Sequence, residues 1–79
     1  MTPAPGSLAT LQAATTVYDA PAGVVGYLVR QDRLVLVVAQ VDVEPVPNGW
    51  STRRWFMVMG TGVPPLRWVP GAGRLVEVC

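Results

Sequence analysis

The sequence predicts a single small all-β domain, a barrel of five or six short strands. Its length of 79 residues suits one domain. Eight glycines and eight prolines are spread along the chain and leave little room for a helix of any length. Between them lie short runs rich in apolar and β-branched residues, which are typical of strands. We expect these strands to close into a barrel, because closure removes exposed sheet edges.

The first strand is expected to start near Leu8, where apolar and polar positions begin to alternate. Leu11, Ala13, Thr15 and Val17 share one face, which is the period-2 pattern of a strand. Turn residues at 19–23 interrupt this pattern. The remaining elements follow in chain order: a short strand at 24–29, a turn at 31–32, a long strand at 33–43, a loop at 45–49, a strand at 53–59, a turn at 60–65, a short strand at 66–69, a single helical turn or a loop at 70–73, and a closing strand at 75–78.

Residues 1–10 are expected to form an extended, Pro-rich N-terminal arm, with the barrel domain in residues 11–79. Pro3, Pro5, Gly6 and Ser7 give the first seven residues too little apolar content to fold alone. Such a segment becomes ordered only when it lies against its own domain or against another chain. We expect the arm to act as a strap on a partner.

Several short motifs follow one another along the chain. They are Thr16-Val17-Tyr18-Asp19-Ala20-Pro21, Val25-Gly26-Tyr27-Leu28, Leu34-Val35-Leu36-Val37, Asn48-Gly49-Trp50 with Trp55, and Gly62 with Trp68-Val69. Over roughly residues 11–78 this order resembles bacterial Src-homology-3-like (SH3-like) domains. Arg67 stands where the family has the glycine of its final Gly-Trp-Val segment, and the preceding turn is longer. The resemblance implies an SH3-like barrel whose ligands are cell-wall peptides, short peptides or other subunits.

The residue inventory argues against an enzyme. The chain has no histidine and no lysine, so the commonest general base and the Schiff-base amine are both missing. Ser7 and Ser51 have no histidine partner, and Cys79 is the only cysteine. A disulfide or a Cys/His zinc site cannot be built within one such chain. We therefore expect no catalytic, cofactor-binding or metal-binding residues.

Two strands are apolar on both faces, which is the main clue to function. The chain is 51% hydrophobic and only 14% charged, against about 25% charged in a typical soluble domain. A strand with one solvated face should alternate apolar and polar residues, so a doubly apolar strand has a covered outer face. The pattern does not show which of the two apolar faces of each strand points outward. The sequence predicts a partner-binding surface composed of Leu34, Leu36, Val38, Trp55, Met57 and Met59, flanked by Arg53 and Arg54.

These features favour a non-enzymatic structural or accessory subunit that docks on other protein subunits of a larger assembly, such as a virus particle or a multi-subunit complex. The alternative is a peptide- or cell-wall-binding module with an aromatic groove near Tyr18, Trp50 and Trp68. Arg30, Arg33, Arg53 and Arg54 could form a basic patch, but a net charge of +1 gives little attraction for nucleic acid. The chain shows neither a secretory signal nor a membrane-spanning run, so we expect action inside a cell, a particle or a large complex.

Overall fold

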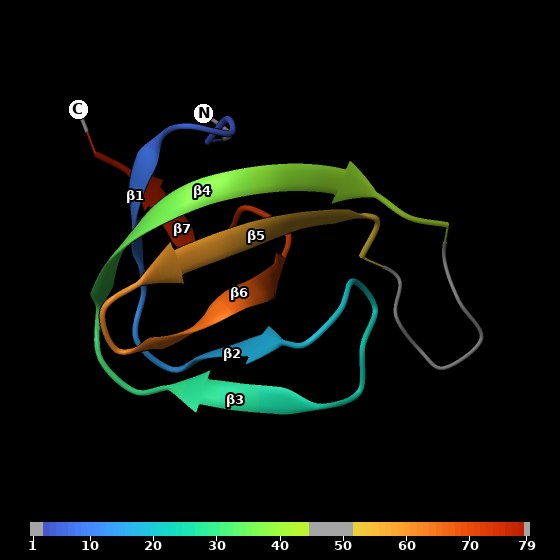
Figure 1. The fold of residues 1–79 in the computed structure, drawn as a ribbon, viewed down its shortest axis with the longest axis horizontal. Helices are drawn as coiled ribbons and strands as arrows, with labels where there is room; N and C mark the ends of the chain where they lie inside the picture. The colour runs from blue at the N-terminus through green and yellow to red at the C-terminus, as the bar shows by residue number, and fades with distance from the viewer. Residues whose placement is uncertain (1–2, 45–51, 79) are drawn as a thin grey trace.

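The structure, a computed structural model, describes residues 3–44 and 52–78. These residues contain strands and turns but no helix, which confirms the all-β prediction. Seven strands follow one another along the chain (Figure 1): β1 (Leu8–Leu11), β2 (Thr15–Tyr18), β3 (Gly26–Val29), β4 (Arg33–Asp42), β5 (Arg54–Gly60), β6 (Val63–Pro70) and β7 (Leu75–Glu77).

All seven strands belong to one antiparallel sheet with the order β3-β2-β6-β5-β4-β1-β7. The sheet is open, and β3 and β7 are its two edges. The predicted closed barrel of five or six strands, and with it the SH3-like barrel, is therefore not confirmed. The additional strand arises at the N-terminal end, where the one strand expected from Leu8 to Val17 is two strands, β1 and β2.

A corner at residues 12–14 separates β1 from β2. Ala14 has a positive φ of 60°, the hydroxyl of Thr15 donates a hydrogen bond to the carbonyl of Gln12 (2.7 Å), and the N–H of Ala13 donates to the carboxylate of Asp32 (2.7 Å). The corner carries the chain from β1, between β4 and β7, to β2, between β3 and β6. The sheet therefore curls, because consecutive strands lie near its opposite ends.

The inner face of the curled sheet encloses one hydrophobic core. Every strand contributes to it: Ala9, Leu11, Val17, Val29, Val35, Val37, Phe56, Val58, Val63, Val69 and Leu75 are buried in a single cluster. Val29 belongs to the edge strand β3 and Leu75 to the other edge strand, β7. The two edge strands therefore share one core, although the sheet between them does not close into a barrel.

The N-terminal segment lies on the domain itself. Pro3 is buried, the N–H of Gly6 donates to the carbonyl of Val37 (2.7 Å), and the N–H of Val37 donates to the carbonyl of Ser7 (2.9 Å). Strand β1 then begins at Leu8, so residues 8–10, assigned to the arm from the sequence, are part of the sheet. The pairing of Leu8 to Leu11 with β4 on one side and β7 on the other accounts for this difference.

Pro64 and Pro65 lie within β6, where the sequence predicted a turn. The register of β5 and β6 shifts there: Gly60 pairs with Val63, whereas Val58 pairs with Arg67. The β6 strand thus has additional residues opposite Met59, and the two prolines occupy this irregularity. A proline has no N–H to give to a ladder, so a bulge is one of the few places where a strand accommodates it.

Candidate functional site

Strand β4 points Leu34 and Leu36 outward and Val35 and Val37 into the core. Leu34 and Leu36 are 58% and 38% exposed, whereas Val35 and Val37 are 1% and 0% exposed. This alternation follows from the pleat of a strand. It answers the question of orientation that the sequence left open. Val38 is half-buried and lies where the register between β4 and β5 shifts.

The strands on either side continue the exposed apolar surface. Leu36 pairs with Leu8 of β1 on one side and with Met59 of β5 on the other. Beyond β1, the N–H of Val78 donates to the carbonyl of Leu8 (3.1 Å). A second row joins Leu34 to Thr10, and Thr10 to Val76 of β7. We call this surface the outer apolar face and define it by Leu8, Leu34, Leu36, Met59, Val76 and Val78.

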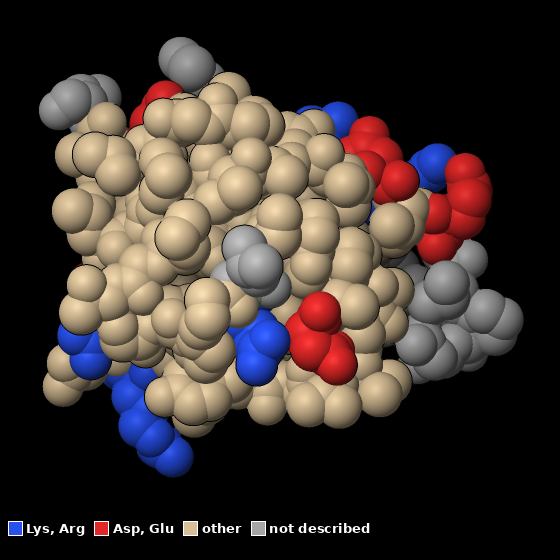
Figure 2. All heavy atoms as spheres, in the orientation of Figure 1, with Lys and Arg blue, Asp and Glu red and all other residues tan. Residues whose placement is uncertain are grey.

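The outer apolar face is large and borders a hollow. Each of its six side chains is 38–58% exposed. Leu36 and Met59 also line an open hollow of about 540 Å³, completed by Gly60, Thr61, Val63 and Pro65. In Figure 2 the surface over the middle of β4 and β5 shows no charged side chain, whereas charged side chains lie near the ends of these strands. An apolar surface with a charged border is typical of a protein–protein contact.

Three of the predicted partner-binding residues belong to this face, and the sequence reasoning missed three others. Leu34, Leu36 and Met59 were among the predicted residues, whereas Leu8, Val76 and Val78 were not. A signal for Val76 and Val78 did exist, because they alternate with the buried Leu75 and the polar Glu77 in the closing strand. Leu8 was predicted to lie where the arm meets the first strand, and its place beside Leu36 emerged only from the strand pairing.

Trp55 cannot form part of a docking surface, which corrects its place among the predicted partner-binding residues. Its position alternates with the inward-pointing Phe56, yet its side chain has no exposed area. The ring of Tyr18 packs edge-on against it, with ring centroids 5.8 Å apart. Its indole N–H donates to the carbonyl of Thr52 (3.2 Å). Contacts within this chain therefore cover a residue that the pattern alone placed on the outside.

Two of the three residues of the predicted aromatic groove lie side by side. Tyr18 of β2 pairs directly with Trp68 of β6, and Trp68 pairs in turn with Met57 of β5. All three side chains are half-buried. Trp50 lies outside the described residues.

The arginines do not gather into one basic patch. Arg54 Nε donates a hydrogen bond to Asp42 Oδ1 (3.1 Å), and Arg53 lies 3.7 Å from a carboxylate oxygen of Glu44. The hydrogen bond and the charge of Asp42 raise the pKa of the Arg54 guanidinium. Both ion pairs are exposed, so solvent screens them. They lie at the end of β4 opposite to Arg33, which separates the two groups of arginines along a long strand.

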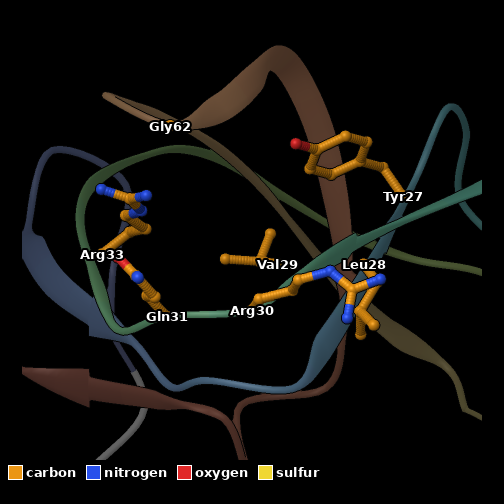
Figure 3. Close-up of a pocket in the computed structure, with 7 residues that line it drawn as sticks. All are labelled: Tyr27, Leu28, Val29, Arg30, Gln31, Arg33 and Gly62. Carbon is orange, nitrogen blue, oxygen red and sulfur yellow. The ribbon is translucent and has the colours of Figure 1, made fainter.

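A second pocket, which the sequence did not predict, lies near the turn between β3 and β4. It has a volume of about 410 Å³ and is lined by Tyr27, Leu28, Val29, Arg30, Gln31, Arg33 and Gly62 (Figure 3). The only signal in the sequence is that Arg30 and Arg33 flank this turn. The participation of Gly62 depends on the distant β5–β6 turn and could not be read from a local pattern.

Within residues 3–44 and 52–78, no group of three or more metal-ligating side chains (His, Cys, Asp or Glu) occurs together. No helix in this part of the chain is long and apolar enough to cross a membrane. Comparisons of the chain with protein-family models, with curated proteins and with solved structures found no match.

Proposed function

We propose that this protein is a non-enzymatic accessory subunit that docks on another protein of a larger assembly through the outer apolar face. The observation that carries this proposal is the row of exposed side chains joined by strand pairing. Val78, Leu8, Leu36 and Met59 come from, or directly follow, four adjacent strands and occupy neighbouring positions. Isolated exposed apolar residues are ordinary, but a contiguous group of them marks an interaction surface.

Burial of this face would contribute to the energy of docking. Full burial of a Leu, Val or Met side chain is worth about 1.5–3 kcal/mol, so burial of a half-exposed one contributes about 1 kcal/mol. The six side chains of the face are all exposed to about this extent. Their sum amounts to several kcal/mol, to which polar contacts at the rim would add. A virus particle or a multi-subunit complex offers the permanent burial that such a surface needs.

An SH3-like architecture remains part of the proposal. The motifs on which the resemblance rests occur in the expected order. Pro21 lies between β2 and β3, Gly26 and Leu28 lie in β3, and Trp55 is the first buried residue of β5. Trp68 and Val69 follow in β6, and β7 closes the chain. The open sheet and its additional strand are departures from the barrel that the resemblance implies.

A second function, peptide or cell-wall recognition, is favoured by one observation. Tyr18 and Trp68 lie side by side on neighbouring strands, with Trp55 packed against Tyr18. Half-buried aromatic pairs of this kind contact proline-rich or extended peptides in other domains. The two functions differ in state: docking requires the outer apolar face to be buried permanently, whereas recognition requires a stable monomer with Tyr18 and Trp68 accessible.

Substitution of Leu36 by aspartate tests the docking proposal. Leu36→Asp places a charge in the middle of the outer apolar face without touching the core, so it should leave the circular dichroism spectrum unchanged. A tagged version of the variant, expressed in the native host, should lose the partner subunits that copurify with the wild type. Val37→Asp, at the adjacent inward position, should unfold the domain because it buries an unpaired charge.

Val24→Asp is the control, because Val24 is exposed and lies in the β2–β3 loop, outside both the outer apolar face and the pocket beside the β3–β4 turn. It should retain the partner subunits. If a folded Leu36→Asp variant still copurifies with the same subunits as the wild type, the outer apolar face is not the docking surface. Retention of a peptide ligand by that variant would then favour the aromatic pair.

A further inference from the structure

The pocket beside the β3–β4 turn combines a cation, a hydroxyl and an apolar floor. In Figure 3 Tyr27 and Arg33 stand on opposite sides of it, with Val29 between them and Gly62 across from Val29. The hydroxyl of Tyr27 points into the space, and Gln31 lies next to Arg33. Arg30 extends away from this centre, past Leu28, so it contributes charge rather than direct contact.

The guanidinium of Arg33 lies beside Gly62 in the turn between β5 and β6. It packs so closely on Gly62 that a Cβ added to Gly62 would lie 2.6 Å from Cζ of Arg33. A guanidinium held by packing loses less conformational entropy when it binds an anion than a free surface arginine does. Arg33 is half-buried, so its side chain is more restricted than that of a fully exposed arginine.

The charge of the pocket is not neutralised within the described part of the chain. The salt bridges there involve Arg53 and Arg54, and no carboxylate pairs with Arg30 or Arg33. Asp32 stands between these two arginines in the sequence, but its carboxylate accepts the N–H of Ala13 and does not line the pocket. Among the described residues, neither Arg33 in the pocket nor Arg30 at its border has an acidic partner.

The pocket also adjoins a free sheet edge. Strand β3 pairs with β2 on one side and is the last strand of the sheet on the other. An extended segment that pairs with such an edge places every second side chain on the same face. On β3 that face carries Tyr27 and Val29, which line the pocket. A segment beside β3 could therefore direct one side chain or its chain end between Tyr27 and Arg33.

We infer that this pocket binds a carboxylate carried by an extended segment of a partner protein. The planar fork of Arg33 matches a carboxylate, the hydroxyl of Tyr27 donates a further hydrogen bond, and the ring of Tyr27 contacts the apolar stem. A phosphate would use the same donors, on Arg33, Tyr27 and Gln31, so the test compares inorganic phosphate with the carboxylate peptides. The volume of about 410 Å³ lies near the lower end of the range for ligand pockets, about 300–1,000 Å³, and suits one residue rather than a larger ligand.

The test titrates the full chain, labelled with ¹⁵N, with short blocked peptides of threonine and serine. One peptide has a single central glutamate, a second has glutamine there, and a third has no acidic side chain but a free C-terminal carboxylate. The glutamate peptide or the free-terminus peptide should shift the amide signals of Tyr27, Val29, Arg33 and Gly62. The glutamine peptide should bind at least about tenfold more weakly, because it lacks the charge that Arg33 pairs with. Which of the two carboxylate peptides binds identifies the source of the carboxylate.

Matched arginine variants separate a specific site from general charge attraction. Arg33→Gln should lower the affinity for the carboxylate peptide about tenfold, and Arg53→Gln, which removes the same charge at the other end of β4, should change it less than about twofold. Tyr27→Phe removes only the hydroxyl and should weaken binding without disturbing the fold, which keeps the test decisive if Arg33→Gln unfolds. Three results would overturn the inference: no shift at the pocket with either carboxylate peptide, equal losses in the two arginine variants, or stronger binding of inorganic phosphate than of the peptides. None of these results bears on the outer apolar face, which Leu36→Asp tests separately.

Discussion

Two features of the structure favour glycine at position 62. Its φ of +79° lies in the left-handed region, which costs a residue with a Cβ about 1–2 kcal/mol. The guanidinium of Arg33 occupies the space that a Cβ would need. The turn between β5 and β6 therefore depends on glycine for its backbone conformation, and the pocket depends on it for the position of Arg33.

We predict that Gly62→Ala lowers the free energy of unfolding by about 1–2 kcal/mol through backbone strain, with a small further loss because the end of the Arg33 side chain must shift. Gly6→Ala is the control, because Gly6 also has a positive φ (+92°) but nothing lies within 4 Å of an added Cβ. It should cost only the backbone strain. Urea denaturation of both variants gives the comparison. In an Arg33→Ala background the loss from Gly62→Ala should shrink, and an unchanged loss would show that the close contact carries no energy.

Strands β4 and β5 show what a local sequence pattern can and cannot predict about a strand. The lack of apolar–polar alternation in the sequence indicated correctly that each strand has two apolar faces, and the structure places one face of β4 in the core. The pattern cannot say which face turns inward, because that depends on which strands pair with β4 on either side. Nor can it show that Trp55 is covered, because the ring that packs on it belongs to Tyr18 of β2.

The elements that differ from prediction do so for reasons of pairing. The corner between β1 and β2 is set by hydrogen bonds from residues 13 and 15 to Asp32 and Gln12, while the alternation of Leu11, Thr15 and Val17 continues through it undisturbed. The period-2 pattern therefore predicts one strand where the structure has two. Pro64 and Pro65 indicate a turn in isolation, but the register shift opposite Met59 accommodates them within β6.

The N-terminal segment gives a prediction at the scale of the element. Residues 3–7 make two backbone hydrogen bonds to Val37 and bury Pro3. Deletion of residues 1–7 should therefore lower the free energy of unfolding by about 1–3 kcal/mol, since each hydrogen bond contributes about 0.5–1.5 kcal/mol. Pro3→Ser should reproduce part of this loss, whereas Pro5→Ser should not, because Pro5 is exposed. If the deletion leaves stability unchanged but weakens incorporation into the assembly, the segment serves only as a strap on a partner.

At the scale of the whole molecule, a short chain divides its apolar residues between a core and a surface. With 51% hydrophobic residues and 14% charged residues, the inner face of one curled sheet cannot hold them all. The remainder lies on the outer apolar face and at β3, where Val25, Tyr27 and Leu28 are 63%, 49% and 42% exposed. Both proposed contacts occur where these remaining apolar residues are exposed: the contact of the outer apolar face with a partner subunit, and the contact of the pocket beside β3 with a carboxylate on an extended segment.

The single core makes a prediction about cooperativity. Val29 and Leu75 belong to the two edge strands, yet they pack into the same cluster. Shortening a core side chain on either edge strand should therefore destabilise the whole sheet. Leu75→Ala should lower the free energy of unfolding by about 2–5 kcal/mol and Val29→Ala by about 1–2.5 kcal/mol, according to the volume removed from the core. Leu34→Ala, at an exposed position, should change stability by less than about 0.5 kcal/mol.

The measurement is urea unfolding followed by two signals in each variant. Far-UV circular dichroism reports the entire sheet, and tryptophan fluorescence, measured in a Trp50→Phe background, reports its middle, where Trp55 and Trp68 lie in β5 and β6. If both edges depend on one core, the two transitions should coincide in the wild type, in Val29→Ala and in Leu75→Ala, and the m-value should not change. If instead an edge strand unfolds separately, the dichroism signal of the corresponding variant will fall at lower urea than the fluorescence signal, because β5 would stay folded after β3 or β7 has detached. That separation would mean that the curled sheet consists of a stable centre with independent edges, and that the free edge of β3 is supported by its hydrogen bonds to β2 rather than by the shared core.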